Sequence, residues 1–430
     1  MGRVCLQLTV LSLILELQIT QVVNSIDDRY ANEMKARQTY CIRRFLFAAT
    51  IVLILCFFFA PITLNIILGR SADTVLKHAH ELDLASEEIS FSLDYKNVFP
   101  HTTISRPEML SAPPESGYPV YSSLLSLVSN WNPDEPEPPA IFKETIQIFN
   151  YSNKLERSYA EKFRNAELPF KLYGVPDILK VANKWNDKYL IDKMKSEHAH
   201  VEESKTNHFM YWNGQRDKGL VEFTPPTNLI SMKFGDWLGT ARKADEEKLE
   251  NDTTHYYFMT GTSANDNLRS YISQDLPIFS TRKNNFFVTN TAANKGIQCR
   301  FGMRGIIAEA HYDSGRNMVA MIKGAKRYIL NPPRMCKMLG IISDVKHPSY
   351  RHSMIDWSDI EQAKSKGFDK VDAIDTIVQT GEVLYIPSYW FHYIVSLKYS
   401  VQCNTRSGSP PNSEGQEDID LCLGYTPKKW

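Results

Sequence analysis

Zones of contrasting hydrophobicity divide the chain, and the most apolar of them lies near the N-terminus. The run Phe45–Leu68 holds 24 residues without a single charge. As a helix rising about 1.5 Å per residue it would extend about 36 Å, more than the roughly 30 Å hydrocarbon core of a bilayer. Pro61 would kink this helix, which membrane helices tolerate. The pattern therefore predicts a transmembrane helix at 45–68 that anchors the chain in membrane lipid.

A weaker apolar run covers residues 1–25, where Glu16 and several uncharged polar residues interrupt it. Three interpretations stay open: a signal peptide cleaved near Ser25, a first membrane span, or a mis-assigned start. Five basic residues lie between the two runs and only two follow closely after the second. This bias predicts a single-pass or two-pass protein whose C-terminal part is lumenal, in the endoplasmic reticulum or Golgi. A cleaved signal peptide followed by a stop-transfer segment would give the opposite orientation. Sequons at Asn150 and Asn251 agree with that orientation.

The next zone, residues 70–142, is rich in proline. Nine of the chain's 22 prolines lie between Pro100 and Pro139. The segment Asp134–Pro139 reads DEPEPP, which suits neither a helix nor a central strand. We therefore predict a partly extended stem or linker over residues 70–142.

Residues 143–410 show the periodicities of a folded domain, followed by a short C-terminal tail at 411–430. Helical patterns with mixed charge come first, at Asp177–Lys184 and Asp192–His198. After Phe286, short apolar strands separated by Gly and Pro dominate: Gly305–His311, Asn317–Lys323, Arg327–Leu330, Glu382–Ile386, His392–Leu397 and Ser400–Asn404. Many short strands with turn residues between them predict a β-sandwich or barrel. Because helices precede these strands, the predicted fold class is α+β.

Composition and charge narrow the class of protein. A hydrophobic content of 43% and a charged content of 23% are those of a globular chain. Lys and Arg together number 49, as do Asp and Glu, so no basic excess favours a nucleic-acid partner. Seven scattered cysteines without a C-x-x-C pair argue against a disulfide scaffold, a zinc ribbon or a thioredoxin-like redox site.

Candidate metal chemistry centres on His311-Tyr312-Asp313, with His392 further along the chain. Residues i and i+2 of a strand point to the same face, so His311 and Asp313 can address one point. A histidine from a distant strand would complete a 2-His-1-carboxylate set, which suits non-haem Fe(II). The spacing alone is weak, because roughly 1.3 H-x-[DE] matches are expected by chance. The other match, His200-Val201-Glu202, lies in a charged segment that we interpret as a solvated helix face.

The surroundings of these residues are more specific than their spacing. The segments GMRGIIAEAHYDSGRNMVAMIKGAKRYILNPP and GEVLYIPSYWFH resemble the JmjC (cupin-like) 2-oxoglutarate oxygenases. Upstream, PFKLYGVPDILKVANKW, MKFGDWL and LRSYISQDLPIF are similar to the helical preamble of the small protein-hydroxylase branch, which includes the asparaginyl hydroxylase acting on hypoxia-inducible factor. The resemblance covers about residues 165–408. It implies a double-stranded β-helix (jelly-roll) core in the catalytic domain, with the helices N-terminal to it.

The resemblance also implies roles for individual residues. Three match the catalytic iron ligands: His311, Asp313 and His392. Four match positions that bind the co-substrate or flank the metal: Lys326, Tyr257, Asn317 and Asn404. Lys326 is expected to pair with the distal carboxylate of 2-oxoglutarate, a role that suits a point charge. The implied cofactor and co-substrates are Fe(II), 2-oxoglutarate and O₂.

One position departs from the family pattern. Where the hydroxylase branch often has Thr or Ser, three residues before the first iron ligand, this chain has Ala308. The expected binding site for 2-oxoglutarate therefore has one hydroxyl donor fewer, unless another residue supplies it.

The expected substrate is a protein or peptide, because aromatic and arginine side chains typical of peptide-binding surfaces flank the ligands. These expected mouth residues are Tyr312, Arg316, Tyr389, Trp390, Phe391 and Arg406, although about two of the three aromatics at 389–391 are expected to pack in the core. Side-chain hydroxylation follows as the expected reaction. Two alternatives stay open: a catalytically silent cupin-like binding domain and a JmjC lysine demethylase.

Overall fold

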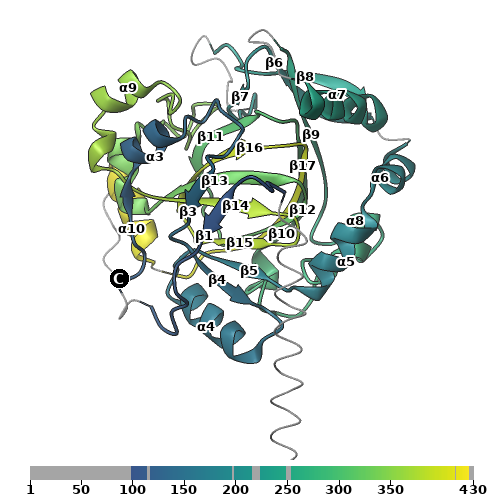
Figure 1. Cartoon of the computed structure of the whole chain (residues 1–430), viewed down its shortest axis with the longest axis horizontal. Helices are drawn as coiled ribbons and strands as arrows, with labels where there is room; N and C mark the ends of the chain where they lie inside the picture. Colours follow the sequence, from purple (N-terminus) through teal and green to yellow (C-terminus); the bar gives the residue numbers. More distant parts are fainter. Residues whose placement is uncertain are drawn as a thin grey trace, which may run out of the picture. The chain divides into compact units, whose positions relative to one another are not determined.

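Two facing β-sheets form the centre of the structure, a computed structural model that describes residues 98–113, 117–195, 198–215, 223–247, 253–411 and 413–425 (Figure 1). The larger sheet runs from edge to edge as β4 (Gln147–Asn150), β5 (Phe170–Tyr173), β15 (Val383–Ile386), β12 (Asn317–Lys323), β17 (Ser400–Ser407), β10 (Asn294–Gly302), β9 (His255–Thr262), β6 (His198–Ser204) and β8 (Asn228–Lys233). The smaller sheet runs as β2 (Ser122–Ser123), β14 (Asp372–Gln379), β13 (Ala325–Asn331), β16 (Phe391–Ser396), β11 (Ile307–Tyr312) and β7 (His208–Phe209). A separate parallel pair joins β1 (Thr103–Ser105) to β3 (Ile141–Lys143).

Helices surround the sheets and confirm the predicted α+β class (Figure 1). The α-helices of the described ranges are α3 (Leu124–Asn130), α4 (Lys154–Asn165), α5 (Pro176–Lys184), α6 (Asp187–Met194), α7 (Phe234–Glu246), α8 (Tyr271–Asp275), α9 (Ile360–Ser365) and α10 (Glu414–Cys422). Short 3₁₀ helices are η1 (Thr291–Ala293), η2 (Pro333–Leu339) and η3 (Phe368–Lys370). Most of the helices precede the first strand of the metal-binding region, as the sequence pattern predicts.

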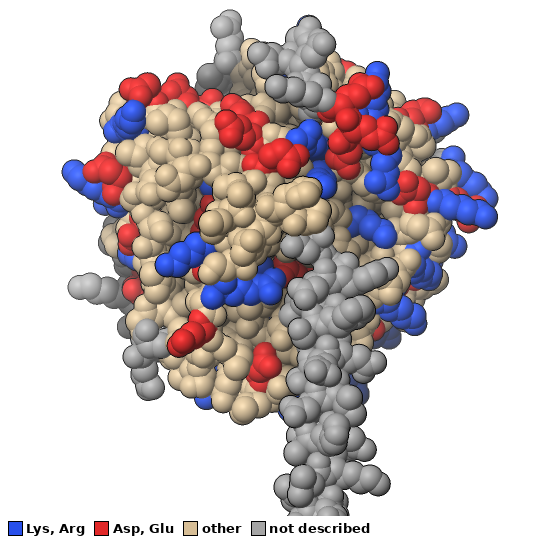
Figure 2. Space-filling model, viewed as in Figure 1, with Lys and Arg blue, Asp and Glu red and all other residues tan. Residues whose placement is uncertain are grey.

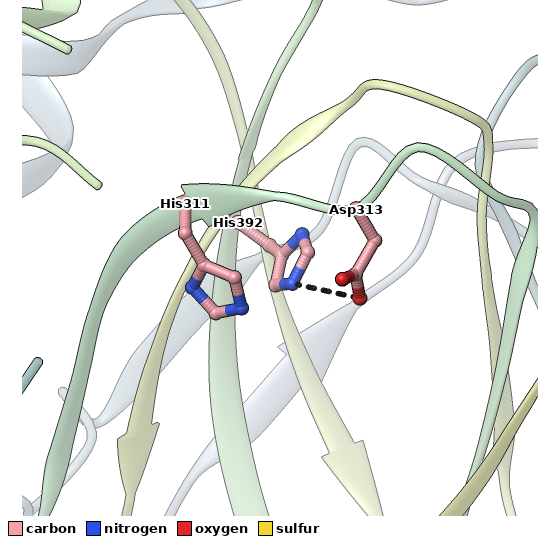
Figure 3. Close-up of side chains that lie close together, drawn as sticks. All are labelled: His311, Asp313 and His392. Carbon is pink, nitrogen blue, oxygen red and sulfur yellow. Dashed lines mark ion pairs between the residues drawn. The ribbon is translucent and has the colours of Figure 1, made fainter. Parts of the chain in front are cut away.

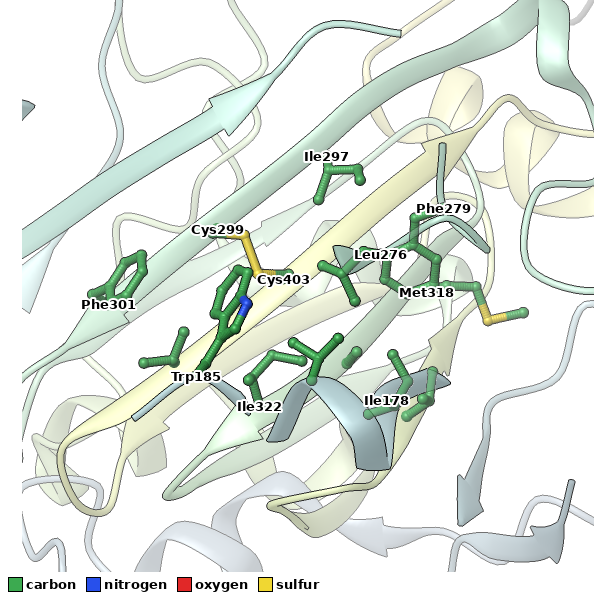
Figure 4. Close-up of a cluster of buried hydrophobic side chains, with 14 of the residues drawn as sticks. Ile178, Trp185, Leu276, Phe279, Ile297, Cys299, Phe301, Met318, Ile322 and Cys403 are labelled. Carbon is green, nitrogen blue, oxygen red and sulfur yellow. A yellow bond between two sulfur atoms is a disulfide. The ribbon is translucent and has the colours of Figure 1, made fainter. Parts of the chain in front are cut away.

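Strand β10 shows how alternation along the sequence builds both faces of the larger sheet. Its residues Ile297, Cys299 and Phe301 are fully buried and belong to an apolar cluster that includes residues of α5 and α8 (Figure 4). Between them, Gln298 and Arg300 line the cavity between the two sheets. Successive side chains of a strand point to opposite faces, so one strand supplies the outer core and the interior wall.

The predicted elements match the structure best where their hydrophobic pattern is continuous. The predicted strand Asn317–Lys323 coincides with β12, and the predicted helix at 177–184 is α5. The predicted helix Asp192–His198 is wrong. The side chain of Asn186 caps a helix that ends at Met194, and β6 begins at His198.

The predicted linker at 70–142 requires correction for the part that the structure describes. Residues from 98 onward contribute β1, β2, α3 and β3 to the folded domain. Leu124 and Val128 of α3 are fully buried, and Ser123 caps this helix by accepting a hydrogen bond from the Ser126 amide. The many prolines lie in the turns between these short elements, and the few apolar residues among them are enough to dock the segment. The described residues between 98 and 142 therefore belong to the folded domain and not to a linker.

The C-terminal segment and the cysteines also differ from expectation. The predicted tail at 411–430 contains α10, whose Cys422 is disulfide-bonded to Cys336 of η2. A second disulfide joins Cys299 and Cys403, which are register partners on β10 and β17. The cysteines form no small-protein scaffold, but these four cross-link segments 104 and 86 residues apart in the chain. The first pairing depends on strand register and the second on the packing of η2 against α10, and spacing along the sequence reveals neither.

The expected membrane segments lie outside the described residues. These are the apolar run at 1–25 and the span Phe45–Leu68. Within the ranges that are described, no helix has the length and apolar character needed to cross a bilayer.

Candidate metal centre and co-substrate pocket

The structure brings His311, Asp313 and His392 together (Figure 3). His311 on β11 and His392 on β16 are register partners in the smaller sheet, and Asp313 follows directly after β11. Candidate ligand atoms of the three side chains all lie within 4.8 Å of one another. Two imidazoles and one carboxylate at this separation can converge on a single metal ion and leave further coordination positions free.

Backbone carbonyls orient both imidazoles. Nδ1 of His311 lies 2.7 Å from the carbonyl oxygen of Glu309, and Nδ1 of His392 lies 3.1 Å from that of Trp390. A carbonyl can only accept, so each Nδ1 carries the proton and each Nε2 keeps its lone pair. An outer hydrogen bond of this kind fixes the tautomer in which Nε2 binds a metal.

Polar side chains hold the carboxylate of Asp313. Arg406 donates to Oδ1 at 2.6 Å, and Asn317 donates to Oδ2 at 3.3 Å. Asn404 in turn donates to the amide oxygen of Asn317 at 2.9 Å. The two predicted flanking asparagines therefore form one chain of hydrogen bonds that ends on the metal-binding carboxylate.

The protonation states suit a cation site. Burial, followed by the charges of His392 and His352, holds the pKa of His311 well below its usual 6.5, and burial likewise lowers the pKa of His392. Burial opposes ionisation of Asp313, but the charges of Arg406 and His392 outweigh it and lower the pKa of this carboxyl. Neutral imidazoles and an ionised carboxylate are the forms that bind a divalent metal.

An interior cavity of about 290 Å³ opens beside the three residues. Both sheets line it, with Tyr257, Asn317 and Asn404 among the wall residues of the larger sheet and Ala308 on the smaller one. Its volume is close to the lower end of known small-ligand pockets, roughly 300 Å³. A small organic acid fits such a space.

Lys326 lies just behind this cavity wall. It is fully buried on β13, and its Nζ donates to the hydroxyl of Tyr257 at 3.2 Å. In the part of the chain that the structure describes, no carboxylate lies within ion-pair distance of this ammonium. Burial, followed by the positive charge of Arg300, lowers the pKa of Lys326 from 10.5 to about 7. An unpaired buried amine is costly for folding, as expected for a group kept to bind an anion.

The unpaired amine predicts a pH-dependent stability. Between about pH 7 and 10, the unfolded chain binds a proton that folded Lys326 has released. The free energy of unfolding of the wild type should therefore rise relative to Lys326→Met by up to about 1.4 kcal/mol per pH unit in this window. Urea denaturation across this range measures the slope. Lys323→Met is the matched control, because Lys323 is half-buried and donates to the Ala182 carbonyl. If the free energy of unfolding depended on pH in the same way in Lys323→Met and Lys326→Met, the pH dependence would not come from Lys326.

Most of the predicted mouth residues do not line the cavity, and only Arg406 does. Trp390 and Phe391 are buried in apolar clusters, as is Tyr312, and Tyr389 packs against one of them. Arg316 forms an ion pair with Glu167 instead. The mouth prediction was wrong for Tyr312 and Arg316, because a residue type alone does not show whether a side chain faces the cavity. The expectation that about two of the three aromatics at 389–391 pack in the core is confirmed.

Other residues, which the sequence patterns did not identify, take those places at the cavity. Tyr211, Arg351 and His352 line it from loops, where no periodicity marks them. Glu202, assigned to a solvated helix face, lies on β6 with 6% exposure and lines the cavity too. Arg300 did leave a signal: polar residues alternate with apolar ones in IQCRFG, the pattern of a strand with one polar wall.

Fold and site together define a class: a jelly roll that presents two histidines and a carboxylate beside a buried lysine is the architecture of cupin-like oxygenases. The chain belongs to the cupin-like domain family, whose model matches residues 156–405. This finding, together with the relatives, confirms the JmjC-type resemblance and the jelly-roll core. Members of this family are typically 2-oxoglutarate-dependent oxygenases.

Curated relatives with different names match about a quarter of this chain. The chain is 30% identical over 107 residues to "Lysine-specific demethylase JMJ30" of Arabidopsis thaliana, covering 25% of this chain and 24% of the relative. It is 31% identical over 111 residues to "JmjC domain-containing protein D" of Dictyostelium discoideum, covering 26% and 25%. It is 32% identical over 108 residues to human "tRNA wybutosine-synthesizing protein 5", covering 24% and 31%. Each match thus spans about a quarter to a third of the relative.

Proposed function

We propose that this protein is an Fe(II)- and 2-oxoglutarate-dependent dioxygenase that hydroxylates a side chain of a protein or peptide. The observation that carries the proposal is the convergence of His311, Asp313 and His392 at the wall of a cavity that is backed by a buried, unpaired lysine. Family membership supports the chemistry, and the residues of the site support the metal and the co-substrate.

The donor set fits Fe(II). Nε2 of His311, Nε2 of His392 and a carboxylate oxygen of Asp313 would hold the ion, since both Nδ1 atoms are tied to carbonyls. When bound, Fe(II) supplies the redox chemistry that couples oxidation of 2-oxoglutarate by O₂ to oxygen insertion into a C–H bond. Arg406 and Asn317 keep the Asp313 carboxylate ionised and oriented.

The pocket walls hold the co-substrate and limit access of water. Lys326 supplies the charge that pairs with a distal carboxylate, and the hydroxyl of Tyr257 lies within hydrogen-bond distance of that ammonium. The apolar side chains of Val319, Ile386 and Ile394 line the same cavity and exclude water from one part of it. A dry, charged pocket positions a small acid against the metal.

The chain contains the features that a silent binding domain would lack. All three metal-binding residues and the lysine are present, and the burial of Lys326 destabilises a fold that has no ligand for it. Ala308 at the cavity wall is the single departure that favours the silent alternative, because it removes one hydroxyl from the co-substrate site.

Proteins and peptides are the preferred substrate class. On the face seen in Figure 2, acidic and basic side chains are interspersed, without the continuous basic stripe of a nucleic-acid groove. One relative is named for tRNA and another as a lysine-specific demethylase, so these two substrate classes are the alternatives that the experiment must separate.

Mass spectrometry of modified products tests this proposal. Candidate proteins, methylated lysine peptides and tRNA are incubated with wild-type protein, Fe(II), 2-oxoglutarate and O₂. We expect a peptide to gain about 16 Da, one oxygen atom, with the wild type and not with His392→Ala. Loss of a methyl group from lysine would identify a demethylase instead. Oxidation confined to RNA or to a free metabolite would contradict the proposed substrate class.

We further propose that the domain resides in an oxidising, lumenal compartment. The disulfides Cys299–Cys403 and Cys336–Cys422 support this, because such bonds persist mainly outside the cytosol. Glycosylation at Asn150 is not expected in the folded domain, since this side chain is 4% exposed and accepts a hydrogen bond from the Ser152 amide. The sequon at Asn251 lies outside the described residues.

Protease protection of the full chain in sealed vesicles measures the compartment. We expect the domain to resist protease until detergent is added, and to show both disulfides when it is isolated with its thiols blocked. Digestion without detergent, together with four free thiols at these cysteines, would contradict a lumenal domain.

A further inference from the structure

We infer that Arg300 is a specificity-determining contact for the distal carboxylate of the 2-oxo acid, so that two cations, Arg300 and Lys326, hold this group where Ala308 provides no hydroxyl. The inference rests on the proposed function and goes beyond it. It predicts a strict requirement for a dicarboxylic 2-oxo acid.

Strand register places Arg300 at the co-substrate wall. On β10 it lies opposite Met259 of β9 and Gln402 of β17, and all three residues line the cavity. Tyr257, the hydrogen-bond partner of Lys326, is the register partner of Gly302, two residues along β10 from Arg300. Residues two apart share a face, so Arg300 and Tyr257 are diagonal neighbours on the same wall.

Lys326 itself does not border the cavity space, whereas Arg300 does. The ammonium lies behind Tyr257, with its Nζ 5.0 Å from the centre of that ring. Of the two cations, Arg300 is therefore the one on the cavity wall, and Lys326 contacts the wall residue Tyr257.

On the smaller sheet, Lys326 lies some distance along the strands from the candidate metal-binding residues. Lys326 is the register partner of Ser396, four residues along β16 from His392. At roughly 3.3 Å per residue this is a backbone separation of about 13 Å, which side chains reaching inward from both positions shorten. A short dicarboxylate bound to the metal by its 2-oxo acid end would direct its other carboxylate toward these cations.

Arg300 is available for a ligand. Within the described ranges it forms no ion pair, in contrast to Arg406, which is paired with Asp313, and Arg304, which is paired with Glu137. Glu202 also lines the cavity, and burial raises its pKa, whereas the positive charge of Arg300 acts to lower it. A carboxyl that is harder to ionise is a weaker permanent partner for Arg300. The charge of Arg300 also lowers the pKa of Lys326, so the two cations repel each other until an anion is bound.

The chemistry of the guanidinium selects a carboxylate. Its planar donors match the two oxygens of a carboxylate, and an ammonium adds a point charge from a second direction. A hydroxyl at position 308 would give only one neutral hydrogen bond. In this pocket, Arg300 on the larger sheet therefore takes the role of the hydroxyl that position 308 on the smaller sheet lacks.

Ligand binding to the full chain loaded with Mn(II), which allows no turnover, tests the inference. Calorimetry compares 2-oxoglutarate with 2-oxovalerate, which has the same 2-oxo acid end and no distal carboxylate. We expect Arg300→Met to weaken 2-oxoglutarate binding roughly 10- to 100-fold, the loss of a charge-assisted contact, and to leave 2-oxovalerate and Mn(II) binding within about twofold. Arg300→Lys should recover part of the loss, and Arg304→Met, four residues along the chain and outside the cavity lining, should bind as the wild type does.

The outcomes separate this inference from the proposed function. Unchanged 2-oxoglutarate binding by Arg300→Met, with a large loss in Lys326→Met, would overturn the role of Arg300 and leave the proposed function standing. Equal weakening of 2-oxoglutarate and 2-oxovalerate would also overturn it, because the effect would not depend on the distal carboxylate. Absence of 2-oxoglutarate binding by the Mn(II)-loaded wild type would contradict the proposed function itself.

Discussion

Replacing His311, Asp313 or His392 by alanine is expected to abolish conversion of 2-oxoglutarate to succinate and to weaken metal binding more than about 100-fold. Each of the three residues offers one ligand atom, and these atoms lie within 4.8 Å of one another. Loss of an outer hydrogen-bond partner of a metal ligand typically costs about 10- to 100-fold, and loss of a ligand should cost more. Metal content after dialysis and succinate release measure the two effects separately.

Two control variants separate the loss of a metal ligand from weaker effects. Asn317→Ala removes a donor to Asp313 without removing a ligand, so it should fall in the range of about 10- to 100-fold. His101→Ala changes an exposed histidine away from the site and should behave as the wild type. Full succinate production by His311→Ala and Asp313→Ala would contradict the assignment of these residues as metal ligands.

Arg327→Met is expected to reduce the free energy of unfolding by about 3–5 kcal/mol, because it leaves a buried carboxylate unpaired. The guanidinium is 1% exposed and forms an ion pair with Asp375 of β14 at 2.6 Å. It also donates to the carbonyl oxygens of Trp131 and Leu127, and it stacks 4.1 Å from the Trp131 ring. One side chain thus fastens the segment around α3 to the smaller sheet.

A second arginine–aspartate pair, between Arg334 of η2 and Asp372 of β14, provides the control. Arg334 and Asp372 also lie 2.6 Å apart, but their side chains are 44% and 39% exposed. Solvent screens such a pair, so Arg334→Met should cost only about 0–1 kcal/mol. The double variant Arg327→Met/Asp375→Leu should recover much of the loss, since it removes the stranded carboxylate. Equal losses in the two single variants, measured by urea denaturation, would show that burial of the Arg327 pair does not matter.

Two distinct kinds of information in the sequence were enough to identify the candidate metal centre. His311 and Asp313 are two apart on a strand, and this local geometry holds in any sheet that accepts the strand. His392 was found through the resemblance of its flanking segment, not through its spacing. Its alignment beside His311 required the register of β11 and β16, which the structure supplies.

The co-substrate pocket was only partly predictable. The resemblance indicated Lys326 and Tyr257, and the structure places them in hydrogen-bond contact. The resemblance gave no reason to select Arg300, because the family pattern does not require a charged residue at this position. The alternation in IQCRFG shows a polar strand face, but only the second sheet turns that face into the wall of a cavity.

By itself, the sequence determined the α+β class and the succession of short strands, since these depend on periodicity, and it identified the candidate ligand residues through short motifs and their resemblance to a known family. The tertiary structure decided that residues 98–142 belong to the domain, that Glu202 and Arg300 face the cavity, and that Tyr312 and Phe391 do not. The physical reason is the same in each case. Whether a polar or aromatic side chain meets solvent, core or ligand depends on which sheet packs against its strand, and that contact joins residues far apart in the chain.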